Sequence, residues 1–274
     1  MSEFVEVPGG RIAYEVTGDA TGPLVVLAPG MGDLRTAYRH VAPALAAAGY
    51  RVVTTDLRGH GESAAGFASY TVGDGADDLA ALVRHLGGGP AIVVGHSFSG
   101  GTAPLLSVRE PSLVRGLVLV APFARPVSPN PVMKLMARLV LSSPALWGMY
   151  YKNLYKGPRP ADFPAHLAAI KTNMRERGRM AAARTMGLDT KPEMAGLLPQ
   201  VSVPALVVMG AKDPDFPDPR AEAETVAAEL GGPAEIVMID GAGHYPHQEC
   251  PAETTEALLR FLRQVAPTGD GVSA

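Results

Sequence analysis

Short apolar runs alternate along the chain with longer stretches in which apolar residues recur every three or four positions. The short runs are rich in Val, Ile and Leu and predict β-strands at residues 11–16, 24–28, 51–55, 91–94, 116–121, 205–209 and 235–239. The longer stretches predict helices at residues 34–48, 72–86, 100–109, 219–230 and 253–264. Several strands are apolar at every position, which indicates burial on both faces. The sequence therefore predicts an α/β fold with a mostly parallel central sheet flanked by helices.

The alternation stops between residues 124 and 200. This segment has no convincing strand, and its helical patterns at 133–141, 145–155, 165–177 and 180–186 are separated by prolines. We interpret it as a helical cap inserted into an α/β core formed by residues 1–123 and 201–267. Ordinary helices packed on the sheet are the alternative. Residues 268–274 are expected to form a frayed tail.

Composition narrows the class of protein. The 274 residues are 47% hydrophobic and 19% charged, with a net charge of −3, which excludes a disordered or collagen-like chain. The slightly negative net charge gives no electrostatic reason to expect a nucleic-acid partner. The single cysteine, Cys250, excludes an internal disulfide. No apolar stretch is long enough to span a membrane, and the first residues lack the features of a secretory signal, so we expect a cytoplasmic protein.

The carboxyl ends of the predicted strands carry the candidate chemistry, because ligands of open α/β sheets bind there. The strand at 91–94 runs into Gly-His-Ser-Phe-Ser-Gly-Gly at 95–101, and a predicted helix follows. A serine on such a turn, here Ser97, projects its hydroxyl into the site, and the next amide faces any developing anion. A serine hydroxyl is a weak nucleophile and needs a base that is itself oriented by a carboxylate.

Two other strand ends supply these groups. Asp213 follows the strand at 205–209, and His244 lies in a glycine-rich loop after the strand at 235–239. We therefore predict Ser97 as nucleophile, His244 as general base and Asp213 as the orienting acid. Asp215 is the alternative acid and His247 the alternative base.

The turn at 95–101 and the order Ser97, Asp213, His244 resemble the α/β-hydrolase family, in its serine hydrolase branch with a helical cap. The last glycine of the family's Gly-x-Ser-x-Gly turn is replaced by Ser99. Residues 29–33, Pro-Gly-Met-Gly-Asp, are similar to the family's oxyanion loop, with Pro29 where histidine is common. The resemblance implies an oxyanion hole formed by the backbone N–H groups of Met31 and Phe98. Residues 56–63 are similar to a structural turn of the family that supports the site.

The resemblance implies hydrolysis of a carboxylic ester or related acyl compound, with no cofactor. The same three residues would also serve C–C bond hydrolysis or cofactor-free perhydrolysis of the haloperoxidase type. Serine in place of aspartate argues against the haloalkane dehalogenase and epoxide hydrolase branches. A ligand-binding or signalling module with little turnover stays open, because Pro29 and Ser99 depart from the usual loops. The expected partner is a small molecule, and the methionines and aromatic residues of the cap would suit an apolar portion of it.

Three other motifs are incomplete. The turn at 95–102 has Gly101 where a P-loop has its lysine, and residues 30–35 have Arg35 where a dinucleotide fingerprint has its third glycine. His244 and His247 have the spacing of a metal-binding pair, but no third ligand is well placed. We therefore expect neither a nucleotide nor a metal. The sequence does not indicate an oligomeric state.

Overall fold

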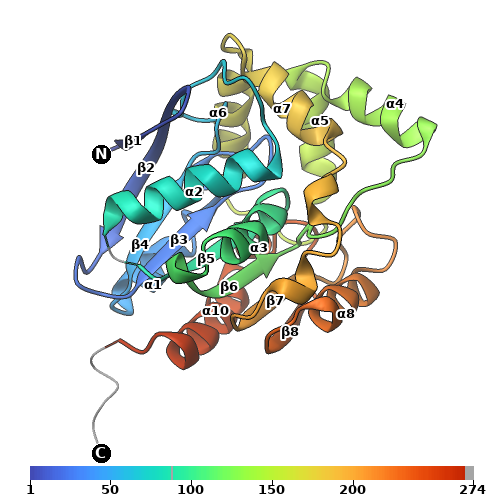
Figure 1. Ribbon diagram of the computed structural model, residues 1–274. Helices are drawn as coiled ribbons and strands as arrows, with labels where there is room; N and C mark the ends of the chain where they lie inside the picture. Colours follow the sequence, from blue (N-terminus) through green and yellow to red (C-terminus); the bar gives the residue numbers. More distant parts are fainter. Residues whose placement is uncertain (88, 269–274) are drawn as a thin grey trace, which may run out of the picture.

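An eight-stranded sheet forms the centre of the protein, with the strand order β1-β2-β4-β3-β5-β6-β7-β8 (Figure 1). The computed structural model describes residues 1–87 and 89–268. β2 pairs antiparallel with β1 and β4, and the remaining neighbours are parallel. The strands are β1 (Glu3–Val7), β2 (Gly10–Gly18), β3 (Leu24–Ala28), β4 (Arg51–Thr55), β5 (Ala91–His96), β6 (Val114–Val120), β7 (Ala205–Gly210) and β8 (Ala234–Ile239).

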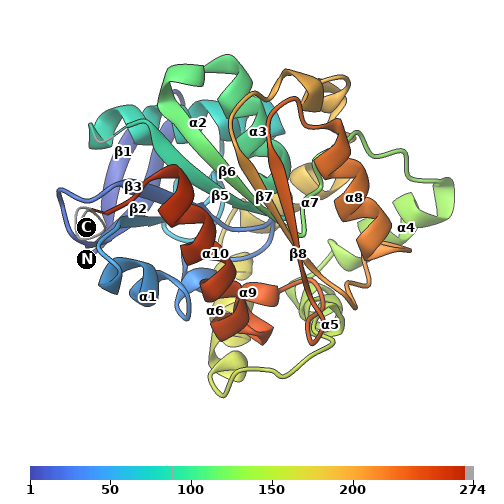
Figure 2. The same cartoon turned by 90° about the horizontal axis from the view of Figure 1, so that it is seen from below.

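Helices cover both faces of the sheet because neighbouring residues of a strand point to opposite faces. Val26 of β3 and Val93 of β5 pack in one apolar core with α2 (Val72–Leu86), α3 (Ser99–Arg109) and α8 (Pro219–Glu229). Val25 and Ile92, one position earlier, pack in a second core with α1 (Ala42–Ala47) and α10 (Pro251–Val265). Figure 2 shows α2 and α3 on one side of the sheet, and α1 and α10 on the other.

Four helices lie between β6 and β7 along the chain and cover the edge of the sheet where the parallel strands end (Figure 1). Their aromatic side chains form a third apolar cluster, centred on Trp147, Tyr151 and Phe163. Tyr245, from the loop before α9, packs in the same cluster. The helices are α4 (Pro131–Val140), α5 (Pro144–Leu154), α6 (Phe163–Arg175) and α7 (Arg179–Leu188). The 3₁₀ helices are η1 (Arg35–Tyr38), η2 (Pro111–Leu113), η3 (Pro192–Met194) and η4 (Leu198–Gln200), and the short helix α9 (Pro246–Glu249) precedes α10.

Among the described residues, the helices are too short or too polar to cross a membrane.

The predicted α/β class is confirmed, and two predicted strands, 24–28 and 51–55, coincide with β3 and β4. The predicted helix at 34–48 is wrong, because the chain there forms η1 and then the short helix α1. Pro43 near the start of α1 has no N–H to continue a helix from η1. The strand β1 was not predicted. The division into core and cap at 123/124 and 200/201 stays a prediction, and we use the name cap for residues 124–200 and the name core for the rest of the chain. Residues 269–274 of the expected tail lie outside the described residues.

Candidate active site

Ser97 occupies a tight turn between β5 and α3. Its φ of 53° lies in the left-handed region, which costs energy for a residue with a side chain. Three hydrogen bonds hold this backbone. The Ser97 N–H donates to the Val120 carbonyl at 2.9 Å, and the Ser97 carbonyl accepts from Gly100 at 2.9 Å and from Phe123 at 3.1 Å. The surrounding backbone thus fixes a conformation that a free chain would avoid.

Glycines on either side of Ser97 permit the close packing of this turn. A Cβ at Gly95 would lie 2.2 Å from the Ser99 carbonyl oxygen, and one at Gly100 would lie 2.5 Å from the Pro122 Cβ. Ser99, where the family has glycine, is buried and its hydroxyl donates to the Pro29 carbonyl at 2.6 Å. The two departures from the family pattern are therefore in contact, and the serine ties the turn to the loop after β3.

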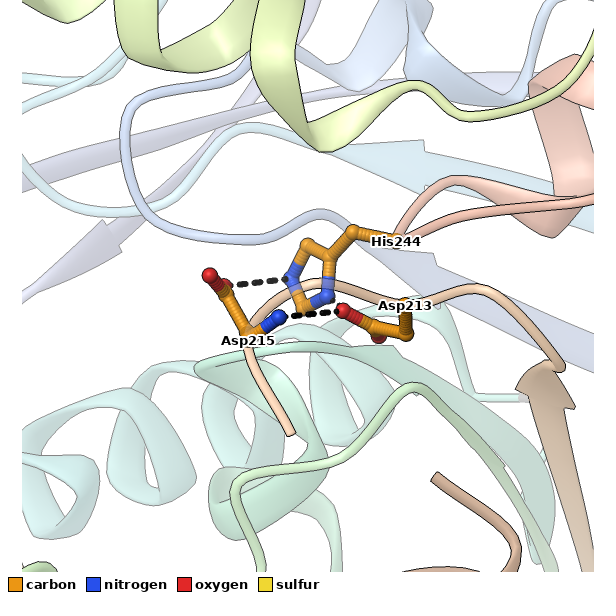
Figure 3. Close-up of side chains that lie close together, drawn as sticks. All are labelled: Asp213, Asp215 and His244. Atoms are coloured by element: carbon orange, nitrogen blue, oxygen red, sulfur yellow. Dashed lines mark hydrogen bonds and ion pairs between the residues drawn. The ribbon is translucent and has the colours of Figure 1, made fainter. Parts of the chain in front are cut away.

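The carboxylates Asp213 and Asp215 lie on either side of the His244 imidazole (Figure 3). Asp213 Oδ2 lies 2.7 Å from His244 Nδ1, and both side chains are buried. Asp215 Oδ2 lies 3.7 Å from His244 Nε2. The Asp215 N–H donates to Asp213 Oδ1 at 2.9 Å, and the Tyr150 hydroxyl of the cap donates to Asp215 Oδ1. The predicted acid and base thus meet, and the alternative acid lies at the opposite ring nitrogen.

The two carboxylates determine the charge state of this imidazole. Burial disfavours the imidazolium form, but the charges of Asp213 and Asp215 outweigh burial and raise the pKa of His244 to about 9. Burial raises the pKa of Asp215 above its ordinary value. At neutral pH the ring is therefore mostly protonated in this arrangement.

Ser97 and His244 line one cavity of about 580 Å³ beneath the cap. The hydrogen bonds of residues 1–87 and 89–268 do not include one between Ser97 Oγ and His244 Nε2. Such bonds often tighten only when substrate binds. The walls are mainly apolar and include Met31, Phe98, Phe123, Met136, Trp147 and Leu154. His247, the alternative base, is buried elsewhere and stacks on Tyr38 with 4.9 Å between ring centres.

The Met31 and Phe98 backbone N–H groups belong to residues that line the same cavity. Within the part of the chain that the structure describes, neither group donates a hydrogen bond to another backbone or side-chain atom. Two backbone donors beside a serine hydroxyl can stabilise an oxyanion when a carbonyl carbon becomes tetrahedral.

The loop that carries Met31 is anchored from both the core and the cap. The Gly32 N–H donates to His60 Nε2 at 3.0 Å, and His60 Nδ1 lies 3.0 Å from the Arg58 carbonyl, to which it donates. Burial lowers the pKa of His60 to about 4, so the ring is neutral and keeps one tautomer. Trp147 Nε1 of the cap donates to the Gly32 carbonyl at 3.0 Å. The sequence predicts residues 56–63 as a supporting turn but does not single out His60, which contacts the loop.

Asp33, the next residue, connects the core to the cap. Its fully buried carboxylate lies 2.9 Å from His166 Nε2 of α6 and accepts from the Tyr151 hydroxyl of α5 at 2.9 Å. The Leu34 N–H also donates to it, at 2.7 Å. Burial alone would raise the pKa of Asp33, but His166 and these hydrogen bonds lower it below the ordinary value. The aspartate is therefore ionised and paired with the cap.

Asp213, Asp215 and His244 are also close enough for metal binding, with one potential ligand atom from each lying within 4.8 Å of the others. A hydrogen bond already joins the Asp213 carboxylate to the imidazole at 2.7 Å. A cation that used these same two atoms would have to replace the proton between them, so the arrangement fits an oriented general base better than a metal site.

Comparisons with known proteins identify the family of the chain. A family profile described as "Alpha/beta hydrolase family" matches residues 25–257. The chain is 28% identical to epoxide hydrolase A of Mycobacterium tuberculosis, over 94% of this chain and 96% of the relative. It is 26% identical to 2-(acetamidomethylene)succinate hydrolase of Mesorhizobium japonicum, over 92% of each protein. A solved structure of a thermophilic esterase from Thermogutta terrifontis is 30% identical and superimposes with a TM-score of 0.79, over 97% and 99% of the two chains. The chain therefore belongs to the α/β-hydrolase family and is a hydrolase of that family.

Proposed function

We propose that the protein is a serine hydrolase that cleaves a carboxylic ester or a related acyl compound. Ser97 Oγ attacks the carbonyl carbon, and His244 takes the hydroxyl proton and later gives it to the leaving group. Asp213 holds Nδ1 and stabilises the imidazolium that forms. Water then attacks the acyl-enzyme, with the same histidine as base.

One observation carries this proposal: Ser97 and His244 line one cavity, while Asp213 holds the other ring nitrogen of His244 at 2.7 Å. The N–H groups of Met31 and Phe98 are the proposed oxyanion hole. Each donor of this kind typically lowers the barrier by about 3 kcal/mol. No step of this sequence requires a cofactor.

The nucleophile favours acyl transfer over epoxide opening, although one relative is named an epoxide hydrolase. A serine that opened an epoxide would become an alkyl ether, which water does not hydrolyse readily. A serine that attacks an ester forms an acyl-enzyme, which water can cleave. The esterase of known structure supports the same class of reaction. We also propose that the apolar walls hold an apolar portion of the substrate, and that the protein acts in the cytoplasm.

A fluorophosphonate probe tests the proposed nucleophile. We expect the probe to label the wild type and Ser99→Ala, but not Ser97→Ala. Ser99 is the matched control because it is the other serine of the turn and donates its hydroxyl to Pro29. Absence of labelling in the wild type would contradict an activated serine and favour a binding module.

Turnover of a substrate panel distinguishes the remaining chemistries. Acyl esters, lactones and thioesters test acyl transfer. Vinylogous diketones test C–C bond hydrolysis, and peroxide with a carboxylic acid tests perhydrolysis. We expect ester cleavage to be the fastest, and a preference for the diketones or for perhydrolysis would replace the proposed substrate class.

A further inference from the structure

A buried lysine faces the candidate active site from the cap side. Lys191 precedes η3, is only 6% exposed and lines the same cavity as Ser97 and His244. Its Nζ lies 5.3 Å from the centre of the Phe98 ring and 5.5 Å from that of Phe123. Since Phe98 directly follows the proposed nucleophile, the ammonium group is close to the reacting centre.

Lys191 Nζ has no counter-ion among residues 1–87 and 89–268. The ion pairs within 4.0 Å and the side-chain hydrogen bonds do not include it. Burial lowers the pKa of Lys191, and the more distant charges of Asp189 and Glu193 compensate only in part. The two aromatic rings stabilise the cation, but more weakly than a paired carboxylate would. An unpaired buried cation is costly for a fold, so a role in binding an anion explains its presence better than a role in packing.

The backbone of Lys191 has a strained conformation. Lys191 has a φ of 51°, in the left-handed region, and the following residue is Pro192, which restricts it further. The Lys191 N–H donates to Asp189 Oδ1 at 3.0 Å, which stabilises the conformation. Strained backbone of this kind is typical of residues that contact a ligand.

The other charged groups around the cavity leave Lys191 available. Asp215 contacts Tyr150 and His244. Asp189 Oδ1 accepts from the Lys191 N–H, and Asp189 Oδ2 is buried without a hydrogen-bond partner among the described residues. Neither carboxylate forms an ion pair with Lys191 Nζ within 4.0 Å. The remaining charged residues that line the cavity, Lys134 and Arg138 of α4, are also basic.

The cap as a whole is basic. Residues 124–200 contain twelve Lys and Arg against four Asp and Glu, a net charge of +8, whereas the rest of the chain contains twelve against twenty-three, a net charge of −11. An anionic substrate would therefore be attracted to the cap side of the cavity.

We propose that Lys191 binds an anionic group of the substrate, so that the preferred substrate is an acyl compound that carries a carboxylate within reach of the cleaved bond. This inference rests on the proposed hydrolase function and specifies its substrate class. Lys191 is then a specificity-determining residue, which forms an ion pair with the bound substrate in a cavity with mainly apolar walls.

A pair of matched esters tests the preference in the wild type. One is the 4-nitrophenyl monoester of adipic acid, whose second carboxyl group is free, and the other is the same compound with that carboxyl group methylated. We expect kcat/KM for the anionic ester to exceed that for the neutral ester by about tenfold or more, mainly through KM. Equal rates on the two esters would overturn the role of Lys191 and leave the hydrolase proposal intact. Cleavage of neither ester, nor of any other acyl compound, would overturn both.

Three variants assign the preference to this side chain. At about 0.5 M NaCl, where the long-range attraction of the cap is screened, Lys191→Gln should reduce the anionic-to-neutral ratio to near one, and Lys191→Arg should keep most of it. Lys152→Gln is the matched control, because it removes the same charge from an exposed position of α5 outside the cavity, and it should keep the ratio. An unchanged ratio in Lys191→Gln, in protein that the fluorophosphonate probe still labels, would contradict the proposal.

Discussion

His244 is held between carboxylates that act on different ring nitrogens. Asp213 fixes Nδ1, which leaves Nε2 directed toward the cavity, and Asp215 then lies 3.7 Å from Nε2. Both charges favour the imidazolium, but only the neutral ring can accept the proton of Ser97. Asp215 therefore stabilises the His244 imidazolium that forms when the Ser97 proton is transferred. It also lowers the fraction of His244 that is neutral and able to act as a base.

The pH dependence of kcat/KM should reveal this second carboxylate. Because the pKa of His244 is raised to about 9, the rate should rise with pH up to that value as the ring becomes neutral. Asp215→Asn removes one of the two charges that raise the pKa, so the rising limb should move toward lower pH, by about one unit. A pH–rate profile on a neutral ester measures the shift.

Asp213→Asn is the comparison for this experiment. It should lower turnover by about 10⁴ because the tautomer of His244 is no longer fixed. An Asp215→Asn profile that coincides with the wild type would show that this carboxylate does not act on the base. A loss of turnover in Asp215→Asn as large as that of Asp213→Asn would make Asp215 the orienting acid.

The residues of the candidate site differ in how far the sequence could predict them. Ser97, Asp213 and His244 follow predicted strands, and parallel strands bring their carboxyl ends to one edge, so their proximity could be expected. Asp215 near Nε2 accepts a hydrogen bond from Tyr150 of the cap, a contact between distant segments that the sequence pattern does not predict. Lys191 lies in the loop between α7 and η3, where the sequence has no periodic pattern of apolar residues. Its burial therefore could not be predicted from the sequence. Contacts between cap and core were therefore the part that the sequence could not supply.

Helices and strands were predicted correctly where the pattern of apolar residues and the turn residues on either side indicate the same element. β3 is an apolar run and β4 is rich in β-branched residues, and both lie between turn residues that mark their bounds in the sequence. The stretch at 34–48 has helical spacing, but Pro43 breaks its hydrogen bonding, and the local break outweighs the pattern. β1 is a short edge strand whose pairing with β2 decides its conformation.

The pairing of Asp33 with α5 and α6 should stabilise the attachment of the cap. His166→Ala leaves the buried Asp33 carboxylate without its imidazole partner and should lower the free energy of unfolding by about 3 kcal/mol. Trp147, the single tryptophan, lies in the cap, so its fluorescence reports on the cap while circular dichroism reports on the whole chain. In urea, the fluorescence transition of His166→Ala should precede the circular dichroism transition.

A surface pair provides the control for this measurement. Arg84 and Glu110 lie 2.7 Å apart, but their side chains are 54% and 37% exposed. Arg84→Gln should therefore change the free energy of unfolding by less than about 1 kcal/mol and leave the two transitions coincident. If His166→Ala behaved like Arg84→Gln, the buried pair would contribute nothing to the attachment of the cap.

Over the whole molecule, charge is divided between a basic cap and an acidic core. The cap covers the edge of the sheet where the strands end (Figure 1), and three of its basic residues, Lys134, Arg138 and Lys191, line the cavity. Long-range attraction of this kind weakens as ionic strength rises, because salt screens charges that lie more than about 10 Å apart at 0.1 M.

Ionic strength should therefore affect anionic and neutral substrates differently. Between low salt and about 0.5 M NaCl, kcat/KM for the anionic adipate ester should fall several-fold, while that for its methylated counterpart should stay nearly constant. Steady-state rates at a series of salt concentrations measure both. Parallel salt dependence of the two esters would show that the charge of the cap does not guide substrate to the site.

The left-handed backbone of Ser97 has a consequence for laboratory evolution. Glycine adopts this conformation freely, whereas serine does so at a cost of about 1–2 kcal/mol. A selection for heat resistance alone would therefore reward glycine at position 97 and discard the reactive hydroxyl. Directed evolution of this protein for thermal stability must therefore also select for catalytic turnover in every round.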